Sequence, residues 1–400
     1  MPANLRLNSN LPSATSEKPV LYLALELGWN SWKLAFAAGP GPAPRRREMT
    51  ARDLAGLVRE IAEAKRRLKL PADCPVMSCY EAGRDGFWLH HWLVAQGVQN
   101  VVVDSASIEV NRRQRRAKSD SLDAAKLLSM LLRYAGGETK LWSVVQVPTV
   151  EQEDARQLHR ELMTLTQEAT EHINRIKSLL ATYGLALETI DRHFPKKLKE
   201  LRQWNGTPLP EALHQRLLRE FERLQVANRQ ARQLEQQRAK EVRQREDSAA
   251  IDQVRKLLGL KAIGIGSAWL YVHEFFAWRK FKNRKQVGSL SGLAPTPYAS
   301  GQLDHDQGIS KAGNKRMRWM AVEIAWGWLH FQPDSELSRW FMERFGRGSS
   351  RQRRIGIVAL ARKLLVQLWK YLETGVPPAG ALLSDWRPKA RLTTRSIEAA

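Results

Sequence analysis

The chain has 400 residues, of which 64 are Lys or Arg and 41 are Asp or Glu, so its formal net charge is +23. This length is enough for two or three domains with cores of their own, and the hydrophobic fraction of 43% with 14 tryptophans excludes an intrinsically disordered chain. The charge favours a polyanionic partner such as nucleic acid. No apolar run approaches the ~18 residues of a membrane span, which excludes an integral membrane protein. The two cysteines and the scattered histidines predict neither a disulfide framework nor a zinc site.

The first part of the chain predicts a small mixed α/β domain over residues 20–145. Residues 20–39 predict two strands with a turn at Gly28–Asn30, and a loop rich in Pro and Gly then leads to a third strand. An amphipathic helix over 50–70 follows, with Thr50 as its N-cap. The remaining elements are a strand at 74–80, a helix at 86–97, a strand at 100–105 and a helix that begins near 120. The predicted strands of this domain are apolar on both faces, which is typical of strands in the centre of a sheet that is covered on both sides.

The middle of the chain, residues 146–250, predicts a helical spacer. Apolar residues recur at steps of three and four over 151–183 and again over 211–245, and the stretch 207–210 contains two prolines. These two long helices could form an antiparallel hairpin or a coiled coil that joins two chains. A simple helical spacer remains an equal alternative to dimerisation.

The last third, residues 251–384, predicts a mostly α-helical domain. Gly264 and Gly266 lie between two helical patterns and resemble a helix-hairpin-helix turn, whose backbone amides can hold a DNA phosphate. Further expected elements are a loop at 292–302, a turn and a helix over 308–329 and a closing amphipathic helix over 353–372. Disordered tails are expected at 1–19 and 385–400. The first of them has no apolar signal-peptide core, so it is interpreted as a loose tail.

Basic clusters precede the helix near 120 and recur in the last third. Lys and Arg bind phosphates without reading sequence, so these side chains are candidates for contacts with a nucleic-acid backbone. An ordinary solvated charged surface is the alternative. The candidates are Arg112, Arg113, Arg115, Arg116, Lys118, Arg279, Lys280, Lys282, Arg284, Lys285, Lys311, Lys315, Arg316 and Arg318.

Four acidic residues stand where they could meet at one end of a sheet. Glu26 lies within an apolar strand, where an unpaired carboxylate is costly, and Glu81 directly follows another strand. Asp120 and Asp123 are one helical turn apart and can face the same ligand. Together they would form an oxygen-rich site suited to Mg²⁺ or Mn²⁺. Alternatively, Glu26 points to solvent from an edge strand, Glu81 caps the next helix and Asp120 is a charge at a helix N-terminus.

Two segments carry a resemblance to a known family. The first segment consists of the strands and acids that end in "KSDSLDAAKL". The second, near the C-terminus, contains "GSLSGLAPTPYASGQ" and "GISKAGNKRMRWMAVEIAW". In these segments the chain resembles the insertion-sequence "one-ten" family of transposases, which includes the Piv-type DNA invertases. The resemblance implies an RNase H-like (RuvC-like) domain at 20–145, a helical coiled-coil spacer at 146–250 and a C-terminal transposase domain at 251–384.

The resemblance also implies site residues. The family's D-E-D-D tetrad of metal ligands is carried over to Glu26, Glu81, Asp120 and Asp123. The family usually has Asp at the first position, and the extra methylene of Glu26 moves its carboxylate by roughly 1.5 Å, which we expect the site to tolerate.

A serine nucleophile is implied as well, and it corresponds to Ser300 in "PYASGQ". It would attack a DNA phosphate and hold the cut strand as a phosphoserine ester. From the residues alone, Ser300 would be a polar turn residue before Gly301. Ser291 and Ser310 are the nearest competitors, and Ser310 is expected to cap the helix that follows it.

The function implied by the resemblance is that of a bacterial DNA transposase or site-specific recombinase that cuts and rejoins strands with Mg²⁺ or Mn²⁺. Its implied partners are the DNA of the element ends and target and a structured guide RNA. A homodimer through the helical spacer and a tetramer in the synaptic complex are expected, without a membrane. The expected location is the cytoplasm, in association with the nucleoid.

Two other functions are compatible with the same residues. One is a RuvC-like, metal-dependent nuclease that cleaves branched DNA without rejoining it. The other is a non-catalytic architectural protein that binds nucleic acid through its positive charge. Cleavage that survives Ser300→Ala would favour the nuclease, and activity that survives Asp120→Asn would favour the architectural protein.

Overall fold

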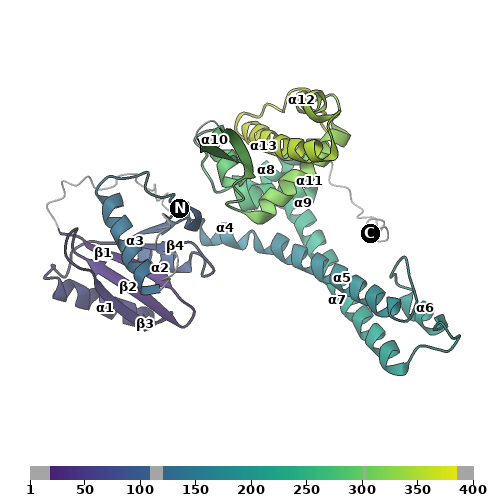
Figure 1. Ribbon diagram of the computed structural model, residues 1–400, viewed down its shortest axis with the longest axis horizontal. Coiled ribbons are helices and arrows are strands. Elements are labelled where there is room, and N and C mark those ends of the chain that lie inside the picture. The colour runs from purple at the N-terminus through teal and green to yellow at the C-terminus, as the bar shows by residue number, and fades with distance from the viewer. Residues whose placement is uncertain (1–18, 109–119, 301–302, 385–400) are drawn as a thin grey trace. The chain divides into compact units, whose positions relative to one another are not determined.

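The computed structural model describes residues 19–108, 120–300 and 303–384. The chain divides into two compact units, with the boundary between Pro148 and Thr149 (Figure 1). The basic cluster at 112–118 and nearly all of both expected tails, 1–18 and 385–400, lie outside the described residues.

The first unit is built, in its described part, on a five-stranded sheet with the order β3–β2–β1–β4–β5. The strands are β1 (Leu21–Leu27), β2 (Ser31–Ala37), β3 (Arg45–Thr50), β4 (Val76–Glu81) and β5 (Gln99–Val103). The pairs β1–β2 and β2–β3 are antiparallel, whereas β1–β4 and β4–β5 are parallel. β1 is therefore the central strand, which explains why its residues are apolar on both faces.

Helices cover both faces of this sheet (Figure 1). α1 (Leu54–Arg67) and α2 (Trp88–Ala95) pack against the face that carries Leu21, Leu23 and Leu25. α3 (Asp120–Ala135) packs against the opposite face, which carries Ala24 and Ala35. The small alanines let the α3 backbone approach the sheet closely. The predicted mixed α/β organisation is confirmed.

The predicted start of α1 is wrong. Thr50 is the last residue of β3, and the N-cap is Asp53, whose Oδ1 accepts a hydrogen bond from the backbone N–H of Gly56 at 2.8 Å. Both residue types are good N-caps, and pairing of β3 with β2 extends the strand through Thr50. Strand pairing in the sheet, rather than the local sequence, therefore determines that Asp53 and not Thr50 caps α1.

The second unit begins with a pair of long helices. Its first elements are α4 (Val150–Asp154), α5 (Gln157–Ala181), α6 (Phe194–Glu200) and α7 (Glu211–Gln244). His159, early in α5, contacts Arg238, late in α7, whereas His172 contacts Glu220 further back along α7. α5 and α7 are therefore antiparallel neighbours, as Figure 1 also shows.

The apolar stripes that predicted these helices face each other within the chain. Leu165 and Ile176 of α5 share a core with Leu217 and Leu224 of α7. Of the two arrangements that the spacing allowed, the structure contains the antiparallel hairpin. Because this hairpin already buries the two stripes, a contact with a second chain would have to use other faces of α5 and α7.

The rest of the second unit is mostly helical, as predicted. Its helices are α8 (Ala249–Leu258), α9 (Ile265–Tyr271), a π-helical turn (Val272–Phe276), α10 (Arg284–Leu290), α11 (Lys315–Phe331), α12 (Glu336–Phe345) and α13 (Ser350–Thr374). They surround one core that includes Trp269, Phe275 and Trp328. Among the described residues, none of the helices has the length and apolar character needed to cross a bilayer.

The expected loop at 292–302 is wrong, because most of it is strand. β6 (Pro295–Ser300) and β7 (Leu303–Ile309) form an antiparallel hairpin, with an irregular register between Pro295 and Pro297. Proline lacks the N–H donor of a strand ladder and normally indicates a loop. The two prolines therefore concealed the strand in the sequence.

Candidate functional site

Glu26 and Glu81 lie side by side at one edge of the sheet. β1 and β4 are parallel neighbours in which Leu25 lies opposite Tyr80, so the next residues, Glu26 and Glu81, are adjacent at the carboxyl ends of the two strands. Both belong to the face covered by α3, because side chains alternate along a strand and Ala24 and Cys79 pack in the core beneath α3. Glu26 is half-buried and Glu81 is exposed. The fold thus brings together two carboxylates that are far apart in the sequence.

Two of the alternative roles for these acids are wrong. Glu26 is not on an edge strand, because β1 has β2 on one side and β4 on the other. Glu81 does not cap the next helix, because α2 begins at Trp88 with Phe87 as its N-cap.

Asp120 and Asp123 lie in the first turn of α3. The Asp123 side chain is half-buried, and that of Asp120 lies outside the described residues. One turn further along α3, the carbonyl of Leu127 accepts a hydrogen bond from the Cys79 thiol at 3.8 Å. Since Cys79 lies two residues before Glu81, this contact joins the middle of α3 to the last part of β4.

The acidic edge offers oxygen donors of the kind that hard divalent cations prefer. Among the described side chains, no group of three His, Cys, Asp or Glu residues is close enough to hold a metal ion. The donor chemistry fits a hard divalent cation, since Glu26 and Glu81 are carboxylates at the ends of neighbouring strands, on the face that α3 covers.

Two residues near this edge were missed by the sequence reasoning. Asp104 directly follows β5 and stands one residue beyond Val103, which pairs with Glu81. The signal that singled out Glu81, an acid just after an apolar strand, applies equally to it. Lys33 lies opposite Glu26 on β2 and forms an ion pair with Glu48. Its ammonium group adds a positive charge beside the acids, and the register of the 20–39 hairpin would have revealed it.

Ser300 belongs to the second unit, where it is the last residue of β6 and pairs with Leu303. Its side chain lies outside the described residues. Ser291 is fully buried, and its hydroxyl donates to the Gly288 carbonyl at 2.8 Å, so it is engaged inside the fold. The expected capping role of Ser310 is wrong, because Asn314 is the N-cap of α11. Asn314 rather than Ser310 caps α11, because Asn314 directly precedes the first helical residue and its side chain accepts hydrogen bonds from two backbone N–H groups.

Backbone hydrogen bonds close the base of the β6–β7 hairpin. The backbone N–H of Ser310 donates to Ala294 at 2.9 Å, and that of Lys311 donates to Gly292 at 3.1 Å. Gly292 has a φ of +71°, and a Cβ there would collide with the carbonyl of Ala312, so only glycine fits.

Six of the candidate basic residues are exposed in the segments that precede and follow the hairpin. They lie before and within α10 or at the start of α11: Lys282, Arg284, Lys285, Lys311, Lys315 and Arg316. Lys280 is also exposed, whereas Arg318 is half-buried and donates to the Ala312 carbonyl at 3.2 Å. The exposed cations thus belong to the two chain segments that precede and follow the hairpin carrying Ser300.

Arg279 differs from the other basic candidates, because its guanidinium is engaged inside the protein. It lies 3.8 Å from the centre of the Trp278 ring and donates to the Glu274 carbonyl at 2.7 Å. Burial, together with the neighbouring positive charge of Arg156, lowers its pKa to about 9. These contacts give Arg279 a structural role in the second unit.

Glu274 links the long helices to the helix that follows the hairpin. Its carboxylate accepts two hydrogen bonds from Arg160 of α5, at 2.6 and 2.9 Å, and one from Asn314, the N-cap of α11, at 2.8 Å. Burial alone would raise its pKa, but the hydrogen bonds and charge of Arg160 outweigh burial, and the pKa is lowered. The ionised carboxylate therefore fixes the start of α11 relative to α5.

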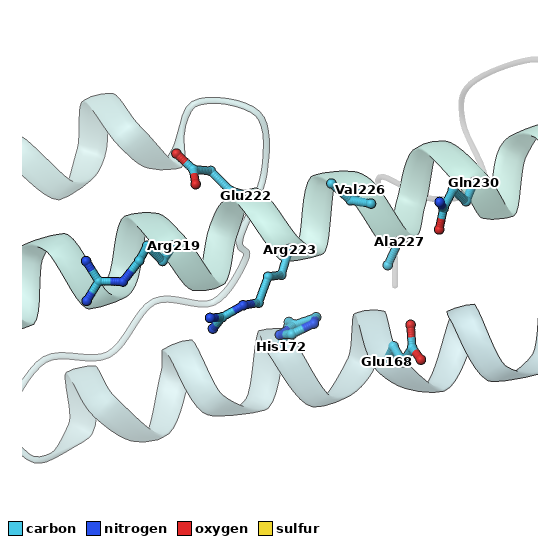
Figure 2. A pocket seen from close by; sticks show the side chains of 8 residues that line it. All are labelled: Glu168, His172, Arg219, Glu222, Arg223, Val226, Ala227 and Gln230. Carbon is cyan, nitrogen blue, oxygen red and sulfur yellow. The ribbon is translucent and has the colours of Figure 1, made fainter.

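A separate hollow of about 480 Å³ lies on the pair formed by α5 and α7 (Figure 2). Glu168 and Glu222 line it together with Arg219 and Arg223, so both signs of charge are present. Figure 2 shows His172 and Arg223 next to each other between the two helices. This balance of charge does not favour a polyanion, and the acids at the sheet edge are the stronger candidate site.

Two family models match separate parts of the chain. A family model described as "Transposase IS116/IS110/IS902 family" matches residues 254–338, which include Ser300. A second model, named for DEDD transposases and described as "Transposase", matches residues 44–184, which include Glu81, Asp120 and Asp123 but not Glu26.

Two curated proteins are similar over much of their length. The chain is 40% identical over 374 residues to "Putative transposase y4rJ" of Sinorhizobium fredii, which covers 91% of this chain and 94% of the relative. It is 26% identical over 233 residues to "Transposase for insertion sequence element IS1111A" of Coxiella burnetii, which covers 57% of this chain and 61% of that protein.

Proposed function

Because the chain belongs to the IS116/IS110/IS902 family of transposases, we propose that it cuts and rejoins the DNA strands of an insertion sequence with an acidic metal site and a serine nucleophile. The observation that carries the proposal is the adjacency of Glu26 and Glu81 at the carboxyl ends of β1 and β4, beside the helix that carries Asp120 and Asp123.

The first unit is proposed to be an RNase H-like domain of the RuvC type. In its favour are the strand order β3–β2–β1–β4–β5, the antiparallel pairing of the first three strands and the parallel pairing of the others. The proposed domains are residues 20–145 for this part, 146–250 for the helical spacer and 251–384 for the transposase domain.

Glu26, Glu81, Asp120 and Asp123 would hold Mg²⁺ or Mn²⁺ in this scheme. Such ions, when bound, stabilise the attacking and the leaving oxygen of a phosphodiester exchange. Lys33 balances part of the acidic charge from the opposite strand, because it is the cross-strand neighbour of Glu26.

Ser300 is the proposed nucleophile. Its hydroxyl oxygen forms a bond to the DNA phosphorus and gives up its proton, while a deoxyribose oxygen leaves and takes up a proton. The phosphoserine ester conserves the energy of the broken bond, so the strand can be rejoined by the reverse exchange without ATP. The exposed cations in the segments that flank the hairpin support this role, because Lys and Arg would hold the DNA backbone.

Further parts of the proposal come from the family. A structured guide RNA would select the target by base pairing, the subunits would act as a dimer or tetramer, and the protein would work on DNA in the bacterial cytoplasm at the nucleoid. The net charge of +23 suits a protein that binds two nucleic acids.

The test is a strand-exchange assay with the DNA of the element ends, in which covalent protein–DNA adducts are also measured. Asp123→Asn is expected to lower strand exchange by more than about a hundredfold, since loss of even the outer partners of metal ligands costs 10–100-fold, while DNA binding is retained. Asp252→Asn is the matched control, because Asp252 also lies in the first turn of a helix, α8, and is expected to keep full activity.

Ser300→Ala separates the proposal from its alternatives. It is expected to abolish the adducts and strand exchange together. Cleavage that persists in Ser300→Ala would identify a RuvC-like nuclease, and strand exchange that persists in Asp123→Asn would remove the acidic site from the mechanism.

A further inference from the structure

An exposed tryptophan lies against two arginines at the acidic edge of the sheet. Trp29, in the turn between β1 and β2, is 61% exposed. The guanidinium carbon of Arg52 lies 4.6 Å from the centre of the Trp29 ring, and that of Arg84 lies 4.8 Å from it. Arginines at this distance are attracted by the aromatic ring.

Hydrogen bonds hold this group, which joins three separate segments. Arg52 donates to the Trp29 carbonyl at 3.0 Å and to the Asp85 carboxylate at 3.2 Å, and Arg84 donates to the same carboxylate at 3.4 Å. Arg52 has a φ of +67°, in the left-handed region that a residue other than glycine rarely adopts. Such backbone strain is concentrated at functional sites, and here the contacts to Trp29 and Asp85 offset it.

The position of the group relates it to the candidate metal ligands. Trp29 comes three residues after Glu26, and Arg84 comes three residues after Glu81. Glu26 and Glu81 are adjacent, so the segment that follows each acid contributes one member of the group. A second tryptophan, Trp88, is 36% exposed at the start of α2 and lies 6.0 Å from the Trp32 ring.

We propose that Trp29, Arg52 and Arg84 bind an unpaired base of the DNA strand whose phosphate enters the acidic site. Proteins that hold single strands combine aromatic side chains, on which bases stack, with cations that contact the backbone. Within the described residues, Asp85 neutralises one of the two guanidinium charges, so the group retains a positive charge for a phosphate. This inference rests on the proposed function, because that function places a DNA phosphate at the neighbouring acids.

A purely structural role explains the group less well. A tryptophan that serves only to join loops would be buried, whereas Trp29 remains 61% exposed although two arginines lie against its ring. RNA bases stack in the same way, but the acids at this edge would act on DNA, so a DNA strand is the ligand that the position selects.

The test measures binding to short labelled single strands of DNA and of RNA and to the DNA duplex of the same sequence, with the full chain in EDTA. Trp29→Ala is expected to weaken binding of the single-stranded DNA by roughly 5- to 100-fold, as for the loss of one stacked base. Trp29→Phe keeps an aromatic face and is expected to restore most of the affinity. Trp204→Ala is the matched control, because Trp204 is 85% exposed but belongs to the other unit.

Salt dependence separates stacking from charge. Trp29→Ala is expected to leave the slope of log K against log salt unchanged, whereas Arg84→Gln is expected to reduce its magnitude by about 0.7 for one lost phosphate contact. Thermal unfolding of each variant distinguishes a folding defect from a binding defect.

Several outcomes would overturn the inference: unchanged single-strand affinity in Trp29→Ala, an equal loss in Trp204→Ala, a loss restricted to RNA, or a loss in Trp29→Ala that Trp29→Phe does not restore. Because EDTA removes the metal, none of these results depends on catalysis. The binding assay therefore tests the stacking site alone, so failure of this inference and failure of the proposed function can be told apart.

Discussion

Glu26 is the member of the proposed tetrad that differs from the Asp expected from the family resemblance. It is half-buried on the central strand, beside Glu81 and opposite Lys33. A carboxylate in this position needs a counter-charge, because burial penalises an isolated negative charge. Lys33 lies opposite Glu26 and is itself paired with Glu48, and in the proposed mechanism a bound divalent cation would supply the remaining counter-charge.

The length of the Glu26 side chain gives a direct prediction. Glu26→Gln keeps the shape but removes the charge and is expected to abolish strand exchange. Glu26→Asp withdraws the carboxylate by roughly 1.5 Å and is expected to lower the rate by about 10- to 100-fold, since a displacement of ~1 Å can cost ~100-fold. The measurement is the single-turnover rate at saturating Mg²⁺. A Glu26→Gln variant with full activity would exclude Glu26 as a ligand.

At the scale of secondary-structure elements, the pair α5 and α7 carries a buried charge network as well as its apolar core. The side chain of Glu220 on α7 is only 5% exposed. It accepts from His172 at 2.7 Å, from Arg175 at 3.0 Å and from Arg223 at 2.8 Å. Burial alone would raise the pKa of Glu220, but the hydrogen bonds from His172 and Arg175 outweigh it and the pKa is lowered. Two partners lie on α5, so the network fixes the register of the pair.

Removal of this carboxylate is expected to destabilise the helical pair. Glu220→Ala leaves His172 partly buried without its acceptor, while Arg175 and Arg223 can turn to water, so we expect a loss of about 1–3 kcal/mol in the free energy of unfolding. Chemical denaturation of the full chain measures it.

Glu222→Ala provides the control for the same helix, because Glu222 is exposed two residues further on. It is expected to change the free energy of unfolding by less than about 0.5 kcal/mol. Equal effects of the two substitutions would show that the buried network does not stabilise the pair.

At the scale of the whole molecule, neutral histidines that are half-buried in the first unit and buried in the second are expected to make stability depend on pH. Burial lowers the pKa of His90 in the first unit to about 4, and the charge of His91 adds to the effect. Burial lowers the pKa of His159 and His273 in the second unit to about 4, and nearby arginines add to the effect. In the unfolded chain these groups titrate near 6.5, so the unfolded chain binds more protons between these two values.

The chain is therefore expected to be most stable above pH 6.5 and to lose stability as the pH falls from 6.5 towards 4. Each histidine contributes at most about 1.4 kcal/mol per pH unit within that window. His159→Gln cannot take up a proton and keeps an acceptor for Arg238, which donates to Nδ1 of His159 at 3.1 Å. It is expected to make the dependence shallower, as measured by thermal unfolding between pH 7.5 and 5. His330→Gln, at an exposed position, is expected to change nothing, and identical slopes for the two variants would refute the assignment.

The positions of strands and helices were largely predictable, because they depend on the spacing of apolar residues along the chain. The apolar runs on either side of the turn at Gly28–Asn30 predicted β1 and β2, and the helical spacing predicted α5, α7, α11 and α13. Predictions that depended on competition between neighbouring structures were less successful. Asp53 replaced Thr50 as a cap because β3 continues through Thr50, and β6 formed despite Pro295 and Pro297 because β7 pairs with it.

The sequence by itself determined that this protein is basic, that it alternates strands and helices before a long helical segment, and that its acids follow apolar strands. It also carried the family resemblance, since that resides in the order of short motifs. Only the tertiary structure decided that β1 is central, that Glu26 meets Glu81, that α5 and α7 bury their stripes against each other, and that Trp29 lies against Arg52 and Arg84. The reason is physical: local spacing fixes which face of an element is apolar, whereas the partner of that face is selected by contacts between residues distant in the sequence.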